Sequence, residues 1–263
     1  MVEANVDGTQ AIRRAAAILR LVGQGNSKGV GLSEITKALN LPRSTAHRIL
    51  KCLVEEGLVG HEPEKRRYVV GLLTYELGLT VTPDLLEITK WRAAVDRVAA
   101  RTGATSYLMS RSGMEVVCLH KAEGRSVIRA IPVEVGQRRF LGVGAGSTAL
   151  LAALDDQTVD RILEAILPAI GDYPALNEQT IRQIIGTARR TGFAVGVGTV
   201  YPDVIGIGRV IPTAADPPAL AMTIAALASQ ASDGRVEGWK QIMNEEIANV
   251  QQAGDVKAQL ETA

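Results

Sequence analysis

The sequence has few of the residues from which cross-links and metal sites are built. Of its 263 residues, two are cysteines and three are histidines. Cys52 and Cys118 cannot form the disulfide framework of a small secreted protein, so a reducing cytoplasm is expected. So few cysteines and histidines also leave little material for a zinc or similar centre. We therefore predict no metal and no cofactor.

Long apolar runs and a large net charge are missing as well. No stretch reaches the roughly 18 uninterrupted apolar residues of a membrane span. The opening MVEANVDGTQ lacks the basic start and apolar core of a signal peptide. With 46% hydrophobic and 22% charged residues, the composition is that of a soluble globular protein. A cytoplasmic protein without membrane contact is expected.

The length of the chain and the distribution of its charges limit the possible domain organisation. A chain of 263 residues exceeds one domain of roughly 100–200 residues, so two domains are expected. Residues 1–80 hold 11 basic and 8 acidic residues, against 18 and 20 in the remainder. This asymmetry does not separate a DNA-binding footprint from chance. Function must therefore be read from residue patterns.

Helical periodicity dominates the first sixty residues. An apolar stripe predicts a helix over 9–24. Ser33 is placed to cap a short helix over 34–39, and a Leu-Pro turn precedes a third helix over 43–56. Apolar residues line one face of that third helix, while its polar and basic residues gather in the N-terminal half. This arrangement is typical of a helix-turn-helix.

A basic hairpin follows the third helix. Strand-forming residues at 57–59 and 67–70 enclose HEPEKR, which predicts a wing that contacts phosphates or a minor groove. Arginine, lysine, serine, threonine and histidine can hydrogen-bond phosphates and base edges. For the third helix alone, a three-helix bundle with a solvated basic face is the alternative. The predicted DNA-binding residues are Arg43, Ser44, Thr45, His47, Arg48, Lys51, Lys65, Arg66 and Arg67.

The run LSEITKALNLPRSTAHRILKCLVEEGLVGHEPEKRRYVVG resembles the IclR family of bacterial transcriptional regulators. In that family, Leu-Pro-Arg-Ser-Thr, His-Arg-Leu-Leu, Glu-x-Gly-Leu-Val and Tyr-x-Leu-Gly recur in this order. The resemblance continues through VGQRRFLGVGAGSTALLA and RRTGFAV, so it spans nearly the whole chain. It implies a winged helix-turn-helix followed by an α+β, GAF-like domain that binds a small effector.

The pattern of the remaining chain agrees with an α+β domain. Strands grouped at both ends, with helices between them, predict one antiparallel sheet covered by helices. Strands are expected over 104–111, 114–121, 126–131, 193–199, 203–211 and 219–227, and helices over 84–101, 147–154, 158–167, 177–191 and 235–252. The predicted divisions are a DNA-binding domain over 1–71, an apolar connector over 72–84, and an effector-binding and oligomerisation domain over 85–263.

Subunit pairing follows from the DNA-reading prediction. Half-sites related by a two-fold axis need a dimeric reader, which favours dimerisation somewhere within 1–101. The apolar stripe of the helix that starts at 84 could pair subunits or pack on its own domain. A dimer or tetramer is expected.

The glycine-rich segment 142–148 is the candidate effector site. It lacks the ending of a P-loop and the G-x-G-x-x-G spacing, so a nucleotide is disfavoured. Free N–H groups at a helix N-terminus favour a carboxylate, although a turn needed only for close packing is the alternative. The family binds small effectors, often organic acids, at this loop. The resemblance implies contacts from Ile131, Arg139, Gly144, Ala145, Gly146, Gly196, Val204 and Gly206.

Two details refine that site. Arg139 could bind a carboxylate bidentately or be a solvated surface arginine. After Gly-Phe-Ala-Val the family usually has an acidic residue, whereas residues 196–199 read Gly-Val-Gly-Thr. The pocket should then be wider and more apolar. We expect a bulkier, aromatic or otherwise hydrophobic acid rather than a two- or three-carbon acid.

Nothing in the sequence indicates an enzyme. Cys118 and His120, two apart on a strand, would share a face and could begin a metal site, but a packed thiol and a hydrogen-bonded imidazole are favoured. No H-E-x-x-H motif occurs. We predict an IclR-type regulator that binds a palindromic double-stranded operator and is controlled by a small acid. A ligand-converting enzyme fused to a DNA-binding module, and a regulator with a purely structural core, are the alternatives.

Overall fold

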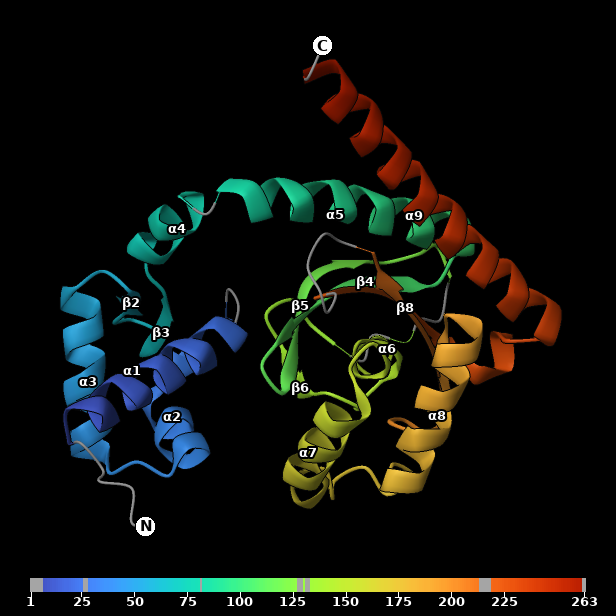
Figure 1. Cartoon of the computed structure of the whole chain (residues 1–263). Coiled ribbons are helices and arrows are strands. Elements are labelled where there is room, and N and C mark those ends of the chain that lie inside the picture. Colours follow the sequence, from blue (N-terminus) through green and yellow to red (C-terminus); the bar gives the residue numbers. More distant parts are fainter. Residues whose placement is uncertain are drawn as a thin grey trace. The chain divides into compact units, whose positions relative to one another are not determined.

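The computed structural model describes residues 7–25, 28–80, 82–126, 130, 133–212 and 219–261. The chain divides into two compact units, Met1–Leu85 and Leu86–Ala263 (Figure 1). Each unit contains helices and an antiparallel sheet, which confirms the mixed α and β fold class. Across these ranges, no helix has the length and apolar character to cross a membrane.

The first unit is a winged helix-turn-helix. Its helices enclose a small core to which α1 contributes Ile18, α2 Ile35 and α3 Leu50. Its sheet has the order β1-β3-β2, and the β2–β3 hairpin is the predicted wing. The elements are α1 (Asp7–Gln24), β1 (Val30–Gly31), α2 (Leu32–Leu39), α3 (Arg43–Glu55), β2 (Val59–Glu62) and β3 (Arg67–Val70).

The ends of α2 show how the turn before α3 is made. Asn40 adopts the left-handed conformation, with φ 48°, and its N–H donates to the Thr36 carbonyl. Asparagine tolerates this conformation better than most residues. The predicted cap was wrong, because α2 begins before Ser33 and its N-cap is Gly31. The Glu34 carboxylate reaches back to accept from the Gly31 N–H at 3.1 Å, which replaces a serine cap.

The segment predicted as a connector is helical over most of its described length. Helix α4 (Leu72–Leu79) follows the wing, and α5 (Thr82–Thr102) begins soon after it. Although α4 is rich in apolar residues, none of them is buried. Its exposed large side chains are Leu72, Tyr75, Leu77 and Leu79.

The second unit is built on one six-stranded antiparallel sheet with the order β6-β5-β4-β9-β8-β7. The predicted strand over 126–131 falls mostly outside the described residues. The three-residue strand β6 was not predicted, since it is too short for a periodic signal. The elements after α5 are β4 (Thr105–Ser112), β5 (Glu115–Ala122), β6 (Arg138–Phe140), α6 (Ala145–Ala152), α7 (Asp156–Ile166), η2 (Leu167–Ala169), α8 (Glu178–Thr191), β7 (Ala194–Val197), β8 (Val204–Ile211), β9 (Leu220–Leu227), η3 (Ala228–Gln230) and α9 (Asp233–Glu261).

Helices cover both faces of this sheet, and each face has its own core. Figure 1 shows α6, α7 and α8 on one side and α5 and α9 on the other. On the α5 side, Trp91, Val95 and Val98 are buried among sheet residues and α9. This part of the α5 stripe therefore packs within its own domain instead of pairing subunits. The side chain of Leu85, at the start of the stripe, lies outside the described residues.

A buried ion pair fastens α9 to α5. The Glu246 side chain is 5% exposed and accepts from Arg97 Nε at 2.6 Å and from Arg101 Nη1 at 2.8 Å. Burial alone would raise the pKa of Glu246, but the two arginines outweigh it, so the pKa lies below its usual value. The carboxylate is therefore ionised throughout the neutral range and holds both guanidinium groups.

We expect Glu246→Gln to lower the free energy of unfolding at pH 7 by about 2 kcal/mol. A fully buried pair would cost roughly 3–5 kcal/mol, but both arginines are nearly half exposed. Because the folded pKa is depressed, the stabilisation is complete above the unfolded value of about 4.3 and is lost as pH falls through the folded value. Urea unfolding from pH 7 to pH 3 measures both effects.

The matched control is Glu237→Gln, also on α9, where an exposed carboxylate pairs with Lys240. It should change the free energy of unfolding by less than about 0.5 kcal/mol. Equal losses in the two variants would show that the α5–α9 ion pair has no special role.

Candidate DNA-binding surface and effector pocket

Helix α3 divides its residues between a core face and an exposed face. Ala46, Leu50 and Leu53 are buried. On the other faces, Thr45 is half-buried, and the exposed members of the predicted set are Arg43, Ser44, His47, Arg48 and Lys51. Lys51 approaches Glu55 at 3.7 Å, whereas Arg43 and Arg48 form no ion pair with an acidic side chain among residues 7–25 and 28–80. Their guanidinium groups are available to an external anion.

The tip of the wing carries two exposed cations. Its turn is closed by the Arg66 N–H, which donates to the Pro63 carbonyl at 3.2 Å, and Arg66 has φ 53°. Lys65 lies 3.0 Å from Glu62 across the hairpin. Lys65 and Arg66 are exposed, as a phosphate contact requires.

Arg67 differs from the other predicted DNA contacts. Its Nη1 donates to both carboxylate oxygens of Glu34, each at 2.7 Å. The Gly31 N–H and then Arg67 hold the pKa of Glu34 below its usual value. Arg67 therefore braces the wing against α2, and the structure separates it from Lys65 and Arg66 at the tip.

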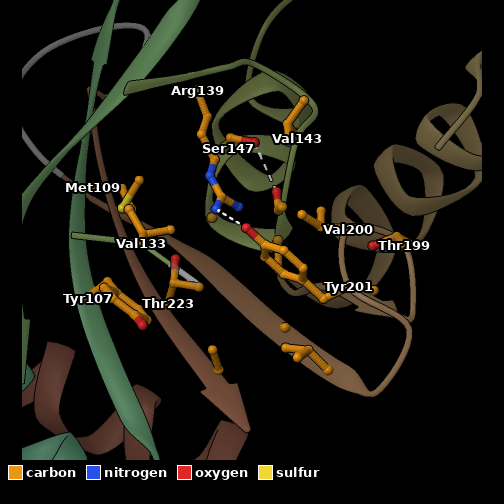
Figure 2. A pocket seen from close by; sticks show the side chains of 17 residues that line it. Tyr107, Met109, Val133, Arg139, Val143, Ser147, Thr199, Val200, Tyr201 and Thr223 are labelled. Atoms are coloured by element: carbon orange, nitrogen blue, oxygen red, sulfur yellow. Dashed lines mark hydrogen bonds between the residues drawn. The ribbon is translucent and has the colours of Figure 1, made fainter. Parts of the chain in front are cut away.

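A cavity lies in the second unit between the sheet and the first turn of α6 (Figure 2). It contains about 580 Å³ of space between protein atoms, part of it open to solvent. Ile131 lies outside the described residues, but the other predicted effector residues all line this cavity: Arg139, Gly144, Ala145, Gly146, Gly196, Val204 and Gly206.

Ten further lining residues were not predicted. Several occupy alternate positions of two central strands, such as Tyr107 and Met109 on β4, and Thr223 and Ala225 on β9. The period-2 pattern of those strands could have identified them, because alternate residues face the same side of a sheet. The others come from loops and the first turn of α6: Val133, Val143, Ser147, Thr199, Val200 and Tyr201.

Arg139 is a buried wall residue of the cavity. It is 8% exposed, so the reading as a solvated surface arginine was wrong. Its Nη2 donates to the Tyr201 hydroxyl at 3.1 Å, and its Cζ lies 5.6 Å from the centroid of the Tyr201 ring. Figure 2 shows these two side chains meeting across the cavity. Tyr201 itself is 40% exposed, so this partner of Arg139 lies at the solvent side of the cavity.

The glycines of the loop serve two different purposes. Gly144, the N-cap of α6, has φ 95°, and a Cβ there would meet nothing within 4 Å, so its backbone conformation requires glycine. A Cβ on Gly146 would lie 2.0 Å from Thr223 Oγ1. On β8, a Cβ on Gly208 would lie 2.4 Å from the carbonyl carbon of Ala145. Gly146 is therefore required for close packing against Thr223, while Gly144 shapes the loop.

The expectation that Cys118 and His120 share a face of the strand was wrong, whereas the favoured packed thiol and hydrogen-bonded imidazole are both found. The β4–β5 register shifts between Leu108, which pairs with His120, and Met109, which pairs with Cys118, so Leu119 is an extra bulged residue. Cys118 packs in the α6-side core, while His120 Nε2 lies 2.7 Å from Asp96 of α5.

The two residues therefore do not share a site. Burial raises the pKa of Cys118 to about 12, so the thiol stays protonated. No group of three or more potential metal ligands occurs in the described ranges.

A winged helix-turn-helix joined to an α+β domain with a cavity is the architecture of a DNA-binding transcriptional regulator. Residues 11–63 match the family described as IclR helix-turn-helix domain, and residues 83–250 match the bacterial transcriptional regulator IclR C-terminal family. The chain belongs to the IclR family. The matched families consist of transcriptional regulators rather than enzymes.

Individual relatives agree with this assignment. The glycerol operon regulatory protein of Streptomyces coelicolor is 30% identical over 203 residues, covering 75% of this chain and 77% of that protein. The regulator TtgV of Pseudomonas putida is 27% identical over 71% of this chain and 70% of its own length.

Solved structures of the family share the fold. An IclR regulator from Alicyclobacillus acidocaldarius superposes with a TM-score of 0.75 at 24% identity, covering 92% of this chain and 97% of that one. An IclR homologue from Microbacterium hydrocarbonoxydans, solved with 4-hydroxybenzoate, has a TM-score of 0.73 at 20% identity, covering 92% and 98%.

Substitution of Gly208 tests the contact on which the cavity wall depends. We expect Gly208→Ala to lower the free energy of unfolding by about 1–3 kcal/mol, because the new Cβ would press on the backbone of α6. Gly238→Ala is the control, since a Cβ on this α9 residue meets no atom within 4 Å. The control should raise stability by roughly 0.5–1 kcal/mol in urea unfolding. A Gly208→Ala protein as stable as the wild type would rule out a tight helix–strand contact.

Proposed function

We propose that this regulator binds a two-fold symmetric operator as a dimer and that a small carboxylic acid in the cavity changes its DNA affinity. The observation that carries the effector part is the buried Arg139, which places a permanent positive charge in the wall of an apolar cavity. A guanidinium group in such a wall can bind a carboxylate through two parallel, charge-assisted hydrogen bonds. One of its hydrogen bonds goes to the hydroxyl of Tyr201, at the solvent side of the cavity.

For DNA reading, α3 enters the major groove. Arg43, Ser44, His47, Arg48 and Lys51 supply its exposed polar surface, and Thr45 adds a half-buried hydroxyl. The wing tip, with Lys65 and Arg66, contacts the phosphate backbone. Arg67 contributes by holding the wing in position, because Glu34 already occupies its guanidinium group.

For dimerisation, α4 provides the apolar surface. Its four exposed large side chains, Leu72, Tyr75, Leu77 and Leu79, are 53–70% exposed within one chain. A second copy of this helix would cover them, and a two-fold axis at that contact would present two α3 helices to two half-sites. The buried part of α5 is not available for this purpose.

The DNA surface can be tested with operators selected from a random double-stranded library. The enriched sequence should be an inverted repeat, and binding should weaken steeply with salt. Arg43→Ala with Arg48→Ala should weaken specific binding about 100-fold or more, since each such contact contributes roughly 1–3 kcal/mol. The readout is a fluorescence anisotropy titration at fixed ionic strength.

The control for this experiment is Arg161→Ala with Arg190→Ala, which removes two exposed arginines of the second unit. It should bind the selected operator within about threefold of the wild type, a difference that corresponds to less than 1 kcal/mol. Undiminished binding by the Arg43/Arg48 variant would show that α3 is not the recognition helix.

For the effector, the cavity combines one charge with a mainly apolar wall. Met109, Val133, Val143, Val200 and Val204 line it around Arg139. The first turn of α6 adds backbone N–H groups, which helices leave unpaired at their N-termini and which favour a carboxylate. Residues 196–199 are neutral, so they add no repulsion to an acid. An aromatic or otherwise hydrophobic carboxylic acid suits this combination.

The 4-hydroxybenzoate complex of the Microbacterium homologue supports the same class, because that protein shares the fold. Tyr201 would compete with the carboxylate of the acid for the guanidinium group of Arg139. Binding would exchange the Arg139–Tyr201 hydrogen bond for a charge-assisted one. To change DNA affinity, the acid must bind one of two conformations of the protein more tightly than the other. We expect these two conformations to differ in the residues around Tyr201.

We expect benzoate to bind measurably by calorimetry and Arg139→Ala to weaken binding at least 10-fold, because charge-assisted hydrogen bonds contribute roughly 1.5–3 kcal/mol. Arg138→Ala is the matched control, since its neighbouring guanidinium pairs with Glu115 at 2.9 Å and does not line the cavity. The control should retain wild-type affinity. Tight binding of pyruvate or glyoxylate with no response to aromatic acids would contradict the aromatic class. A lack of binding by any acid would favour a purely structural core.

A further inference from the structure

Two buried hydroxyl groups face the cavity and are not used by the protein. Tyr107 is 1% exposed, and the Oγ1 atom of Thr223 is also buried. Neither oxygen has a well-formed hydrogen bond among the described residues, and the Val133 backbone, which lowers the pKa of Tyr107, gives its O–H no acceptor. Buried hydroxyls normally find partners, because leaving them unpaired costs free energy. Both residues line the cavity, so a bound molecule could supply what the protein does not.

The two hydroxyls belong to one patch of the wall. Tyr107 on β4 and Thr223 on β9 are direct partners in the antiparallel register. Directly opposed residues place their side chains next to each other on the same face of the sheet. Figure 2 shows both side chains on the sheet wall of the cavity. Gly146 permits this placement, because a Cβ there would collide with Thr223 Oγ1.

This patch is separate from Arg139, the residue proposed to bind the carboxylate. Arg139 on β6 pairs with Val116, and Val116 pairs with Arg111 on β4. Tyr107 lies four residues further along β4, which corresponds to roughly 13 Å along the strand. Arg139 and Tyr107 therefore enter the cavity from different levels of the sheet.

We propose that Tyr107 and Thr223 form a second polar subsite, so that the effector is an aromatic carboxylic acid with a hydroxyl or carbonyl oxygen remote from its carboxylate. This inference rests on the proposed function, because it places the carboxylate at Arg139. Burial raises the pKa of Tyr107 above its usual value, so the phenol is a donor at neutral pH. The Thr223 hydroxyl can donate or accept, and a phenolic or carbonyl oxygen of the ligand satisfies both residues.

The test compares ligands of the same shape. Calorimetry should show that 3- or 4-hydroxybenzoate binds the wild type at least tenfold tighter than the methylbenzoate with its substituent at the same position. In the variant Tyr107→Phe with Thr223→Val, that preference should fall to within threefold, while benzoate binds as it does to the wild type. Equal wild-type affinity for hydroxy and methyl acids, or a preference that survives in the variant, overturns the subsite.

The outcomes separate the two proposals. Benzoate binding that depends on Arg139, without any preference for a hydroxyl group, overturns the subsite and leaves the proposed function intact. Failure of every acid to bind overturns both. The ligand-free protein provides a second readout that does not depend on the choice of acid.

An unused hydroxyl should not stabilise the empty protein. Tyr107→Phe and Thr223→Val should therefore leave the thermal midpoint of the ligand-free protein within about 1 °C of wild type or raise it. Thr148→Val is the control, because the Thr148 hydroxyl lies 3.0 Å from the Gly142 and Gly144 carbonyl oxygens that can accept from it. Its midpoint should fall. A comparable fall for Tyr107→Phe or Thr223→Val would mean that these hydroxyls have a structural role, which contradicts the subsite.

Discussion

The close approach of α6 to the sheet is the contact on which the second unit depends. At Gly208 the strand backbone comes so near to Ala145 that no side chain fits between them, and Gly146 meets Thr223 in the same way. Strand β8 is buried on its opposite face by Ile205 and Ile207, so it cannot move away to relieve a larger residue. The helix is thereby seated with its N-terminus against the sheet, and the loop before it closes one side of the cavity.

The position of α6 against the sheet also determines which side chains line the cavity. Beside the first turn of α6, Tyr107, Thr223 and Arg139 line the cavity. The wall is then mostly apolar, with one cation, two unpaired hydroxyls and the start of a helix. Such a cavity can select a bound molecule by its shape and by a few polar atoms.

Much of this organisation could be predicted from the sequence because it is governed by local rules. Periodicity located α3, the wing, α8 and the late strands, and the glycine-rich motif located the cavity. The errors arose where the local structure depends on contacts with residues far away in the sequence. Glu34 replaced Ser33 at the start of α2. It also bound Arg67 across the unit, which no pattern in either segment indicates. A bulge at Leu119 sent His120 to the opposite face from Cys118, which reversed a period-2 inference.

By itself, the sequence determined the class of protein: a winged helix-turn-helix with a basic, exposed α3 and an α+β partner domain. Helix periodicity, turn residues and family motifs are properties of neighbouring residues, so they can be read without coordinates. Only the tertiary structure decided that Arg139 is buried against Tyr201 and that Tyr107 and Thr223 share one wall. These facts depend on strand register and on how closely α6 approaches the sheet, which bring together residues that are far apart in the chain.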